Sequence, residues 1–239
     1  MTRVDMLAVG AHPDDVDLTC GGTLAAAKDQ GYGVAILDLT RGELGTRGSA
    51  GIRQAEAAKA AQILGVDERI NAELPDAHVW NSDDNRRLMV GLLRSYLPRT
   101  VIAPYPVGRH PDHRESSLLV RDSCFLAGLA NYPADGEIHK PEKLIYTSTY
   151  REDAGKPTFV VDISAQFERK LEAIRCYQSQ FEGVVQAGEL FPTGQDLYDL
   201  VRTQNAHYGS LIRTAYGEPF LSEETVRVDD VVAMGVQSL

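Results

Sequence analysis

The stretch Met6-Leu7-Ala8-Val9-Gly10-Ala11-His12-Pro13-Asp14-Asp15 couples an apolar run to a short polar turn. The same order recurs further along the chain, where Val101-Ile102-Ala103 precedes His110-Pro111-Asp112-His113. Continuous apolar runs like these predict strands that are buried on both faces of a parallel sheet. Open α/β sheets bind their ligands at the edge where the carboxyl ends of the strands meet. We therefore expect both polar tetrapeptides to lie at that edge, facing one another.

Outward from these two runs, strand and helix patterns alternate. Strands are expected at Val4–Gly10, Val34–Leu39, Ile70–Leu74, Thr100–Ala103, Lys143–Thr149 and Thr158–Ile163. Helices are expected from Gly21 to about Gly31 and at Ile52–Leu64, Asp83–Leu97, His113–Leu129, Gln166–Gln178 and Gln195–Tyr216. Such alternation is typical of a parallel sheet with right-handed crossovers. The predicted fold class is α/β, a Rossmann-like three-layer fold with a mostly parallel sheet and a site at the C-terminal ends of the strands. We expect a single domain over residues 1–239, with an added strand-and-helix portion from about residue 140.

Composition limits the class of protein. The chain has 239 residues, of which 43% are hydrophobic, enough for a substantial core and outside the range of disordered chains. Its formal net charge of −10 would repel a nucleic-acid backbone, so we expect a small-molecule substrate and no nucleic-acid partner. No apolar run is long enough to cross a membrane, and no signal-peptide pattern is present. The cysteines Cys20, Cys124 and Cys176 lie far apart and form no metal or disulfide motif, which predicts a reduced, cytoplasmic protein.

The two tetrapeptides supply candidate ligands for a divalent metal. A catalytic zinc ion typically keeps three protein ligands and one open position for water. His12 and Asp15 lie three residues apart in a turn preset by Pro13, so both side chains can reach one point. His113 would complete the set from the second strand end. Imidazole and carboxylate ligands accept zinc and also iron, so the sequence leaves the choice between these metals open.

The other polar residues of the tetrapeptides suggest acid–base roles. Asp14 is adjacent to a ligand and not needed as one, so it is the candidate base that takes a proton from water. His110, three residues before His113, is the candidate acid for a leaving nitrogen or the stabiliser of an oxyanion. Asp112 would orient His110 by accepting its second ring proton. This inventory predicts a metal-activated hydrolase.

Other interpretations of these residues stay open. The acidic cluster at residues 14–17 would also be favoured at a helix N-terminus by the helix dipole. Gly10, Gly21 and Gly22 suggest a dinucleotide loop, although their spacing is not G-x-G-x-x-G. The alternatives are therefore a metal hydrolase of another small amide or ester, a non-catalytic dinucleotide-binding Rossmann module, and a metal-binding protein without turnover.

Taken together, the motifs resemble those of a known family. Ala11-His12-Pro13-Asp14-Asp15 followed by Gly21-Gly22-Thr23, with the later His110-Pro111-Asp112-His113, is similar to the signatures of the LmbE-like or PIG-L family. Members of this family are metal-dependent N-acetylglucosaminyl deacetylases. The similarity extends through Thr40–Gly45 and Ile52–Glu56, and covers roughly the first half to two-thirds of the chain.

One branch of the family looks most similar. The stretch Gly108–His113, with Phe125–Leu129 after it, resembles the bacillithiol-biosynthesis branch, which removes acetate from N-acetylglucosaminyl-malate. The resemblance therefore implies that this chain hydrolyses the acetamide of an N-acetylglucosamine derivative, with that glycoside as the expected substrate. Relatives of this kind often form hexamers, so the resemblance also implies a homo-oligomer, as large as a hexamer.

The resemblance also implies roles for individual residues. It makes His12, Asp15 and His113 the zinc ligands, Asp14 the general base, and His110 the partner acid and electrostatic stabiliser. Arg53 matches an arginine that binds the sugar or the anionic side of the substrate. Without the resemblance, Arg53 would be interpreted as a solvated charge in the first turn of a helix.

Two positions depart from the family pattern. The commoner form of the first signature ends in Glu, whereas this chain has Asp17, which is shorter by one methylene. Some relatives carry a tyrosine that assists the oxyanion two residues before the first His of the second signature, where this chain has Gly108. Tyr105 is the candidate replacement nearby in sequence, although a core tyrosine is the commoner role.

Overall fold

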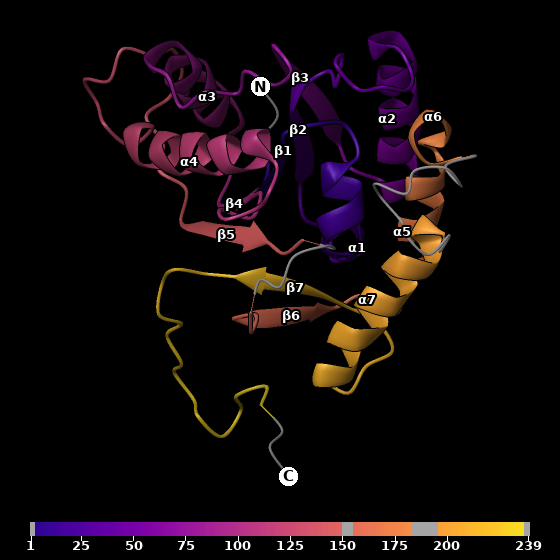
Figure 1. Cartoon of the computed structure of the whole chain (residues 1–239). Coiled ribbons are helices and arrows are strands. Elements are labelled where there is room, and N and C mark those ends of the chain that lie inside the picture. The colour runs from indigo at the N-terminus through magenta and orange to yellow at the C-terminus, as the bar shows by residue number, and fades with distance from the viewer. Residues whose placement is uncertain (1–2, 150–154, 183–195, 237–239) are drawn as a thin grey trace.

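The computed structural model describes residues 3–149, 155–182 and 196–236. Within them, one seven-stranded sheet has helices on both faces (Figure 1). The strands are β1 (Met6–Gly10), β2 (Val34–Thr40), β3 (Glu68–Leu74), β4 (Thr100–Ala103), β5 (Lys143–Thr147), β6 (Phe159–Asp162) and β7 (Gly217–Leu221). The helices are α1 (Asp15–Asp29), α2 (Ala50–Leu64), α3 (Asp83–Tyr96), α4 (Pro111–Leu126), α5 (Phe167–Arg175), α6 (Gln178–Phe181) and α7 (Leu197–Leu211).

The order of the strands places a switch point at the centre of the sheet. The spatial order is β3-β2-β1-β4-β5-β7-β6. The first five of these strands are parallel, whereas β7 pairs antiparallel with both β5 and β6. From β1 the chain moves outward to β2 and β3, and then crosses back to β4 on the other side of β1. Ligands of open α/β sheets bind at such a reversal, so the carboxyl ends of β1 and β4 are the expected place for a site.

Two apolar layers hold the helices on the sheet. All seven residues of β2 are buried, which explains why the central strands have continuous apolar sequences. On one face α3 and α4 pack over a core that includes Leu93 and Leu119. On the other face α1, α2 and α5 share a core that includes Leu24 and Leu64. The predicted α/β fold with a mostly parallel sheet is confirmed.

The structure differs from the sequence-based expectation most clearly at β7, which was not predicted, and at the bounds of two helices. Helix α1 begins at Asp15, six residues before the expected Gly21, so the acidic turn also opens a helix. The helix expected at Gln195–Tyr216 ends at Leu211, and Gln195 lies outside the described residues. A side chain at Gly209 would come within 2.7 Å of the Tyr216 backbone nitrogen, because the chain folds back there into β7. In the described part of the chain, no helix is both long and apolar enough to cross a membrane.

Candidate metal centre

The two polar tetrapeptides meet at the carboxyl edge of adjacent strands. In the parallel register of β1 with β4, Met6 pairs with Thr100 and Ala8 with Ile102, so the two strands end side by side. His12 follows β1 in the turn that leads into α1, and His113 lies in the first turn of α4. The structure therefore brings together residues that are about a hundred positions apart in the sequence.

Three side chains lie at the spacing that a metal ion needs. His12 Nδ1 is 3.4 Å from Asp15 Oδ2, and His113 Nε2 is 3.2 Å from the same oxygen. Two ligands that are each about 2.1 Å from a tetrahedral zinc ion lie about 3.4 Å apart. The side chains of His12, Asp15 and His113 thus fit a three-ligand centre, and their ligand atoms all lie within 4.8 Å of one another.

The charges of this triad favour a cation. Burial alone would raise the pKa of Asp15, but His113 and His12 lower it well below its usual value. Burial would lower the pKa of His12, but hydrogen bonds to Asp112, Asp15 and Asp76 raise it well above 6.5. The Asp15 carboxylate likewise raises the pKa of His113 against the effect of burial. A metal ion would therefore compete with the ring protons for the same ligand atoms.

The second ring nitrogen of His12 is held by two carboxylates. Asp76 Oδ1 lies 3.2 Å and Asp112 Oδ2 3.3 Å from His12 Nε2. Carboxylates placed this way fix the orientation of a metal-binding imidazole. Asp112 also accepts a hydrogen bond from the backbone N–H of Ala77, at 2.9 Å. Asp112 Oδ2 thus contacts the ring of His12, and the predicted role of this carboxylate in orienting His110 stays a prediction.

Asp76 was not among the predicted site residues. It follows the end of β3 in Leu74-Pro75-Asp76, and β3 is an edge strand with few apolar residues. The glycine-rich loop after β2 holds Asp76 in place: Leu44 N donates to its Oδ2 at 2.9 Å, and Glu43 Oε1 accepts from its backbone N–H at 2.9 Å. An acidic residue after a third strand end was the only signal that could have identified it.

Asp14 lies beside the triad in a strained backbone conformation. Its φ of 122° is rare for a residue with a side chain, and such strain often marks a functional turn. Its side chain is 14% exposed, and Asp14 Oδ2 lies 3.2 Å from Arg53 Nη2. Burial raises the pKa of Asp14 to about 7, while the Arg53 guanidinium acts in the opposite direction. A carboxyl group with a pKa near neutrality suits a general base.

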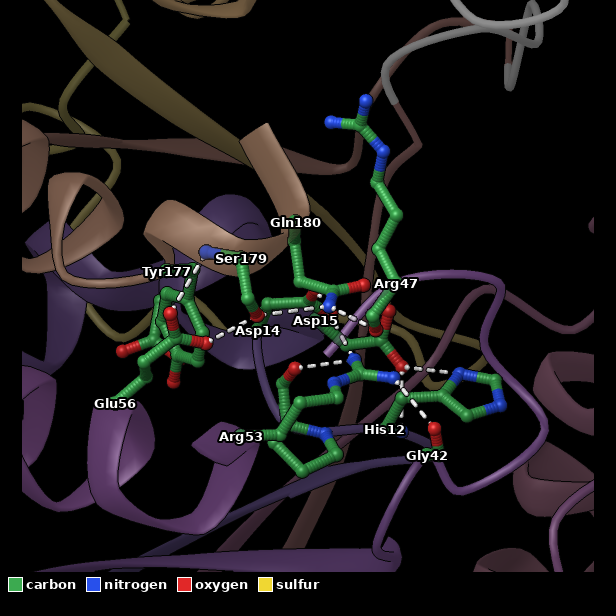
Figure 2. A network of polar contacts seen from close by, with 12 residues as sticks. His12, Asp14, Asp15, Gly42, Arg47, Arg53, Glu56, Tyr177, Ser179 and Gln180 are labelled. Atoms are coloured by element: carbon green, nitrogen blue, oxygen red, sulfur yellow. Dashed lines mark hydrogen bonds and ion pairs between the residues drawn. The ribbon is translucent and has the colours of Figure 1, made fainter. Parts of the chain in front are cut away.

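Arg53 braces this turn from helix α2. Its Nη2 donates to the Pro13 carbonyl at 2.8 Å and its Nη1 to the Gly42 carbonyl at 3.1 Å (Figure 2). A side chain at Gly42, whose φ is +65°, would come within 1.9 Å of the guanidinium. The predicted contact of Arg53 with substrate stays a prediction, since both terminal nitrogens bind the protein itself. The buried Nε has no hydrogen-bond partner among the described residues.

His110 caps helix α4 at the rim of the centre. Its Nδ1 accepts a hydrogen bond from the Asp112 backbone N–H at 3.2 Å. In the neutral ring the proton therefore sits on Nε2. The ring centroid lies 4.9 Å from those of both His12 and His113. Burial and the neighbouring histidines lower the pKa of His110, so this ring is neutral more readily than the other two.

Asp17, in the first turn of α1, belongs to a second buried network of hydrogen bonds. The Asp17 carboxylate accepts hydrogen bonds from Arg69 Nη1 at 3.0 Å and from the Tyr177 hydroxyl at 2.7 Å. Arg69 also binds Asp38 on β2 through Nε at 2.7 Å. Asp17 is fully buried, and these hydrogen bonds tie α1 to Arg69 of β3 and to Tyr177.

The loop before His110 is held by its own backbone. Gly108 is buried, and its carbonyl accepts a hydrogen bond from Arg114 Nη1 at 2.9 Å. Tyr105 is half-buried in the same loop. No hydrogen bond to its hydroxyl is found among the described residues, and a role for it at an oxyanion stays a prediction.

Comparisons with known proteins find similar deacetylases. A family model described as "PIG-L: GlcNAc-PI de-N-acetylase" matches residues 7–124, which include both tetrapeptides. The diacetylchitobiose deacetylase of Thermococcus kodakarensis is 29% identical over 232 residues, covering 89% of this chain and 80% of that protein. A probable N-acetyl-α-D-glucosaminyl L-malate deacetylase 2 of Bacillus anthracis is 27% identical over 198 residues, covering 74% of this chain and 81% of that protein.

A solved structure extends the similarity to nearly the whole chain. The conserved protein TT1542 from Thermus thermophilus is 36% identical and superposes with a TM-score of 0.85, covering 95% of this chain and 98% of that one. The relatives support a deacetylase of the N-acetylglucosamine type. The chain belongs to the PIG-L/LmbE-like deacetylase family.

Proposed function

We propose that this protein is a zinc-dependent N-deacetylase that hydrolyses the acetamide of an N-acetylglucosamine derivative. The observation that carries the proposal is the joint placement of a three-ligand triad, a buried carboxyl with a pKa near 7 and a neutral histidine at one sheet edge. Iron would fit the same ligands in the cell. A dinucleotide module gains no support, because His12 and Asp15 occupy the turn after β1 where a pyrophosphate would lie.

The chain's own residues divide the proton transfers between them. A bound zinc ion would lower the pKa of a water molecule and polarise the acetyl carbonyl. Asp14 accepts a proton from the attacking water as the water oxygen bonds to the acetyl carbon. The Nε2–H of neutral His110 donates a hydrogen bond to the oxyanion that forms on the acetyl oxygen. The proton held by Asp14 then passes to the sugar nitrogen as the carbon–nitrogen bond breaks, so that acetate and an amine are released. Asp76 and Asp112 hold His12 in orientation throughout.

We propose N-acetylglucosaminyl-malate, the substrate of the bacillithiol branch, as the first substrate to test. The Bacillus anthracis relative supports this choice, since its name specifies that glycoside. The substrate carries carboxylates, whereas the protein has a net charge of −10, so binding needs a local cation. Arg53 is the family's candidate, and the exposed Arg109, directly before His110, is the second.

Diacetylchitobiose is the second candidate substrate. The Thermococcus kodakarensis enzyme named for it matches 89% of this chain, a longer share than the 74% matched by the Bacillus anthracis protein. This sugar is uncharged, so it would require no cation at the rim. The two candidates therefore differ in whether activity depends on arginine side chains near His110.

Acetate release from a panel of N-acetyl sugars tests the proposal. The panel holds N-acetylglucosaminyl-malate, N-acetylglucosaminyl-inositol, diacetylchitobiose and free N-acetylglucosamine, assayed with zinc-loaded and chelated protein. We expect release from at least one sugar, with the highest kcat/KM for the malate glycoside, and loss of activity on chelation. Asp14→Asn serves as the background control. Zinc-loaded protein that releases acetate from none of the four sugars would contradict the deacetylase assignment, and a higher kcat/KM for diacetylchitobiose would replace the malate glycoside.

A further inference from the structure

Arg47 is an exposed cation in the glycine-rich loop, which is residues 41–49 between β2 and α2. Its Nη1 donates to the carbonyl of Glu182 at 3.0 Å, and within the part of the chain that the structure describes no carboxylate pairs with it. A guanidinium has five N–H donors, and Nε and Nη2 together form one of its edges. Arg47 therefore keeps a pair of parallel donors that fits a carboxylate.

Helices α6 and α2 hold the backbone of Arg47 in place. Gln180 Nε2 of α6 donates to the Arg47 carbonyl at 2.7 Å. The next residue is Gly48, with a φ of +69°, and a Cβ there would come within 2.6 Å of Ser179 Oγ, so this close approach requires glycine. Ser179 is fixed in turn by the buried Glu56 of α2, whose carboxylate accepts hydrogen bonds from its backbone N–H and its hydroxyl, each at 2.7 Å (Figure 2). Arg47 is therefore positioned by a network of specific contacts, unlike a loose surface charge.

The loop also places Arg47 beside the turn that carries the candidate base. A Cβ added at Gly45 would lie 3.3 Å from Arg53 Nη1 and 3.7 Å from the Arg47 carbonyl oxygen, so the two arginines flank this glycine. Arg53 contacts the base Asp14 through Nη2 at 3.2 Å. In Figure 2 the guanidinium of Arg47 extends away from Arg53 and lies clear of the other labelled side chains. The backbone of Arg47 thus lies next to the metal centre while its charge reaches outward, where a part of the substrate beyond the acetamide would lie.

We propose that Arg47 selects substrates that carry a carboxylate outside the N-acetylglucosamine ring, an inference that rests on the proposed deacetylase function. Arg53 lies nearer the metal centre, but its terminal nitrogens already bind Pro13, Gly42 and Asp14. Arg47 presents Nε and Nη2, so a carboxylate on the aglycone binds it side-on through two hydrogen bonds. An uncharged aglycone gains no ion pair from this contact. Arg47 therefore distinguishes acidic from neutral glycosides of the same sugar.

Substitution of Arg47 in the zinc-loaded protein tests this selection. In Arg47→Gln, the ratio of kcat/KM for N-acetylglucosaminyl-malate to kcat/KM for diacetylchitobiose should fall about 10-fold or more, because the charge-assisted hydrogen bonds are lost. Most of the fall should come from KM, since the carboxylate is the same in the ground state and the transition state. Arg47→Lys keeps the charge without the paired donors and should recover part of the ratio. Arg41→Gln is the matched control and should leave the ratio unchanged, because Arg41 is exposed in the same loop but lines a hollow between α2 and β3.

A binding measurement keeps this test independent of turnover. N-acetylglucosaminyl-malate is titrated by calorimetry into zinc-loaded Asp14→Asn protein, and the further substitution Arg47→Gln should raise its Kd about 10-fold or more. This measurement stands even if the wild type releases acetate from no sugar, a result that would contradict the deacetylase function itself. An unchanged ratio or Kd in Arg47→Gln, no measurable binding of the glycoside, or an equal effect of Arg41→Gln would each overturn the role of Arg47.

Discussion

At the scale of single residues, the centre separates ligands from the base. His12, Asp15 and His113 converge on one point, whereas Asp14 turns toward Arg53. His113→Ala and Asp15→Ala should therefore lose most bound zinc together with activity, because three protein ligands are the minimum for a tight catalytic site. Asp14→Asn should keep its zinc and lose about 10²–10⁴-fold in kcat, the usual cost of removing a general base.

Metal analysis and kcat on the same preparations decide this prediction. His110→Ala should follow the pattern of Asp14→Asn, with metal retained and rate reduced. If Asp14→Asn lost its zinc while Asp15→Ala kept it, the two aspartates would have the opposite roles.

Arg53 allows a pH test of the base. Asp14 works only as a carboxylate, so kcat/KM should fall as the pH drops through its pKa, which burial raises to about 7. The guanidinium of Arg53 opposes that rise. Arg53→Met should therefore raise the pKa further and move the acid limb of the profile to higher pH, while Arg53→Lys should move it less. The pH dependence of kcat/KM for an uncharged N-acetyl sugar measures this shift. If the acid limb stayed at the same pH in both variants, Arg53 would have no influence on the pKa of Asp14.

The sequence was sufficient to predict those residues of the metal centre that lie in the two local motifs. Two His-Pro-Asp turns after apolar runs were enough to place His12, Asp15, His113 and Asp14 together. Asp76 could not be found this way, because it follows an edge strand with little apolar signal and reaches His12 only through the fold. The contact of Asp112 with His12 was not predicted, because closeness in sequence to His110 and His113 says nothing of a ring that lies a hundred residues away.

At the scale of elements, strand β7 shows what a sequence pattern misses. Gly217-Glu218-Pro219 has low strand propensity, yet it pairs antiparallel between β5 and β6. Glu218 is fully buried and accepts hydrogen bonds from the backbone N–H groups of Gly22 and Thr23 in α1. Lys170 of α5 pairs with it at 2.6 Å. Partners from α1 and α5, more than forty residues away, thus make a glutamate acceptable in this strand, and no local window contains them.

Lys170→Met should destabilise the fold strongly. It leaves a buried carboxylate without its cation, which costs about 3–5 kcal/mol in comparable pairs. Arg169→Met is the matched control one position away, because Arg169 pairs with Asp29 near the surface, where such pairs contribute about 0–1 kcal/mol. Urea unfolding of both variants measures the difference in free energy of unfolding. Adding Glu218→Gln to Lys170→Met should recover part of the lost stability. Equal stability of Lys170→Met and Arg169→Met would contradict a stabilising role for the buried pair of Lys170 and Glu218.

At the scale of the whole molecule, metal binding links the two halves of the parallel sheet. His12 and Asp15 enter from β1 and α1, whereas His113 enters from α4 after the crossover to β4. An ion bound there stabilises only the folded chain, by RT ln(1 + [L]/Kd), or about 4 kcal/mol at a thousandfold excess over Kd. Zinc should therefore raise the melting temperature of the chelated protein, and His113→Ala should lose most of that rise.

The size of this zinc effect should depend on pH in a defined direction. The carboxylates around His12 and His113 raise the pKa of both rings above 6.5, despite burial. Protonated rings stabilise the metal-free fold at low pH, and that contribution is lost as the pH rises through their folded-state pKa values. Zinc needs the neutral rings, so protons compete with it most at low pH. The difference in melting temperature between zinc-loaded and chelated protein should thus grow from about pH 6 to pH 8, as differential scanning fluorimetry can measure. A difference that shrinks over this range would mean that zinc binds away from these histidines.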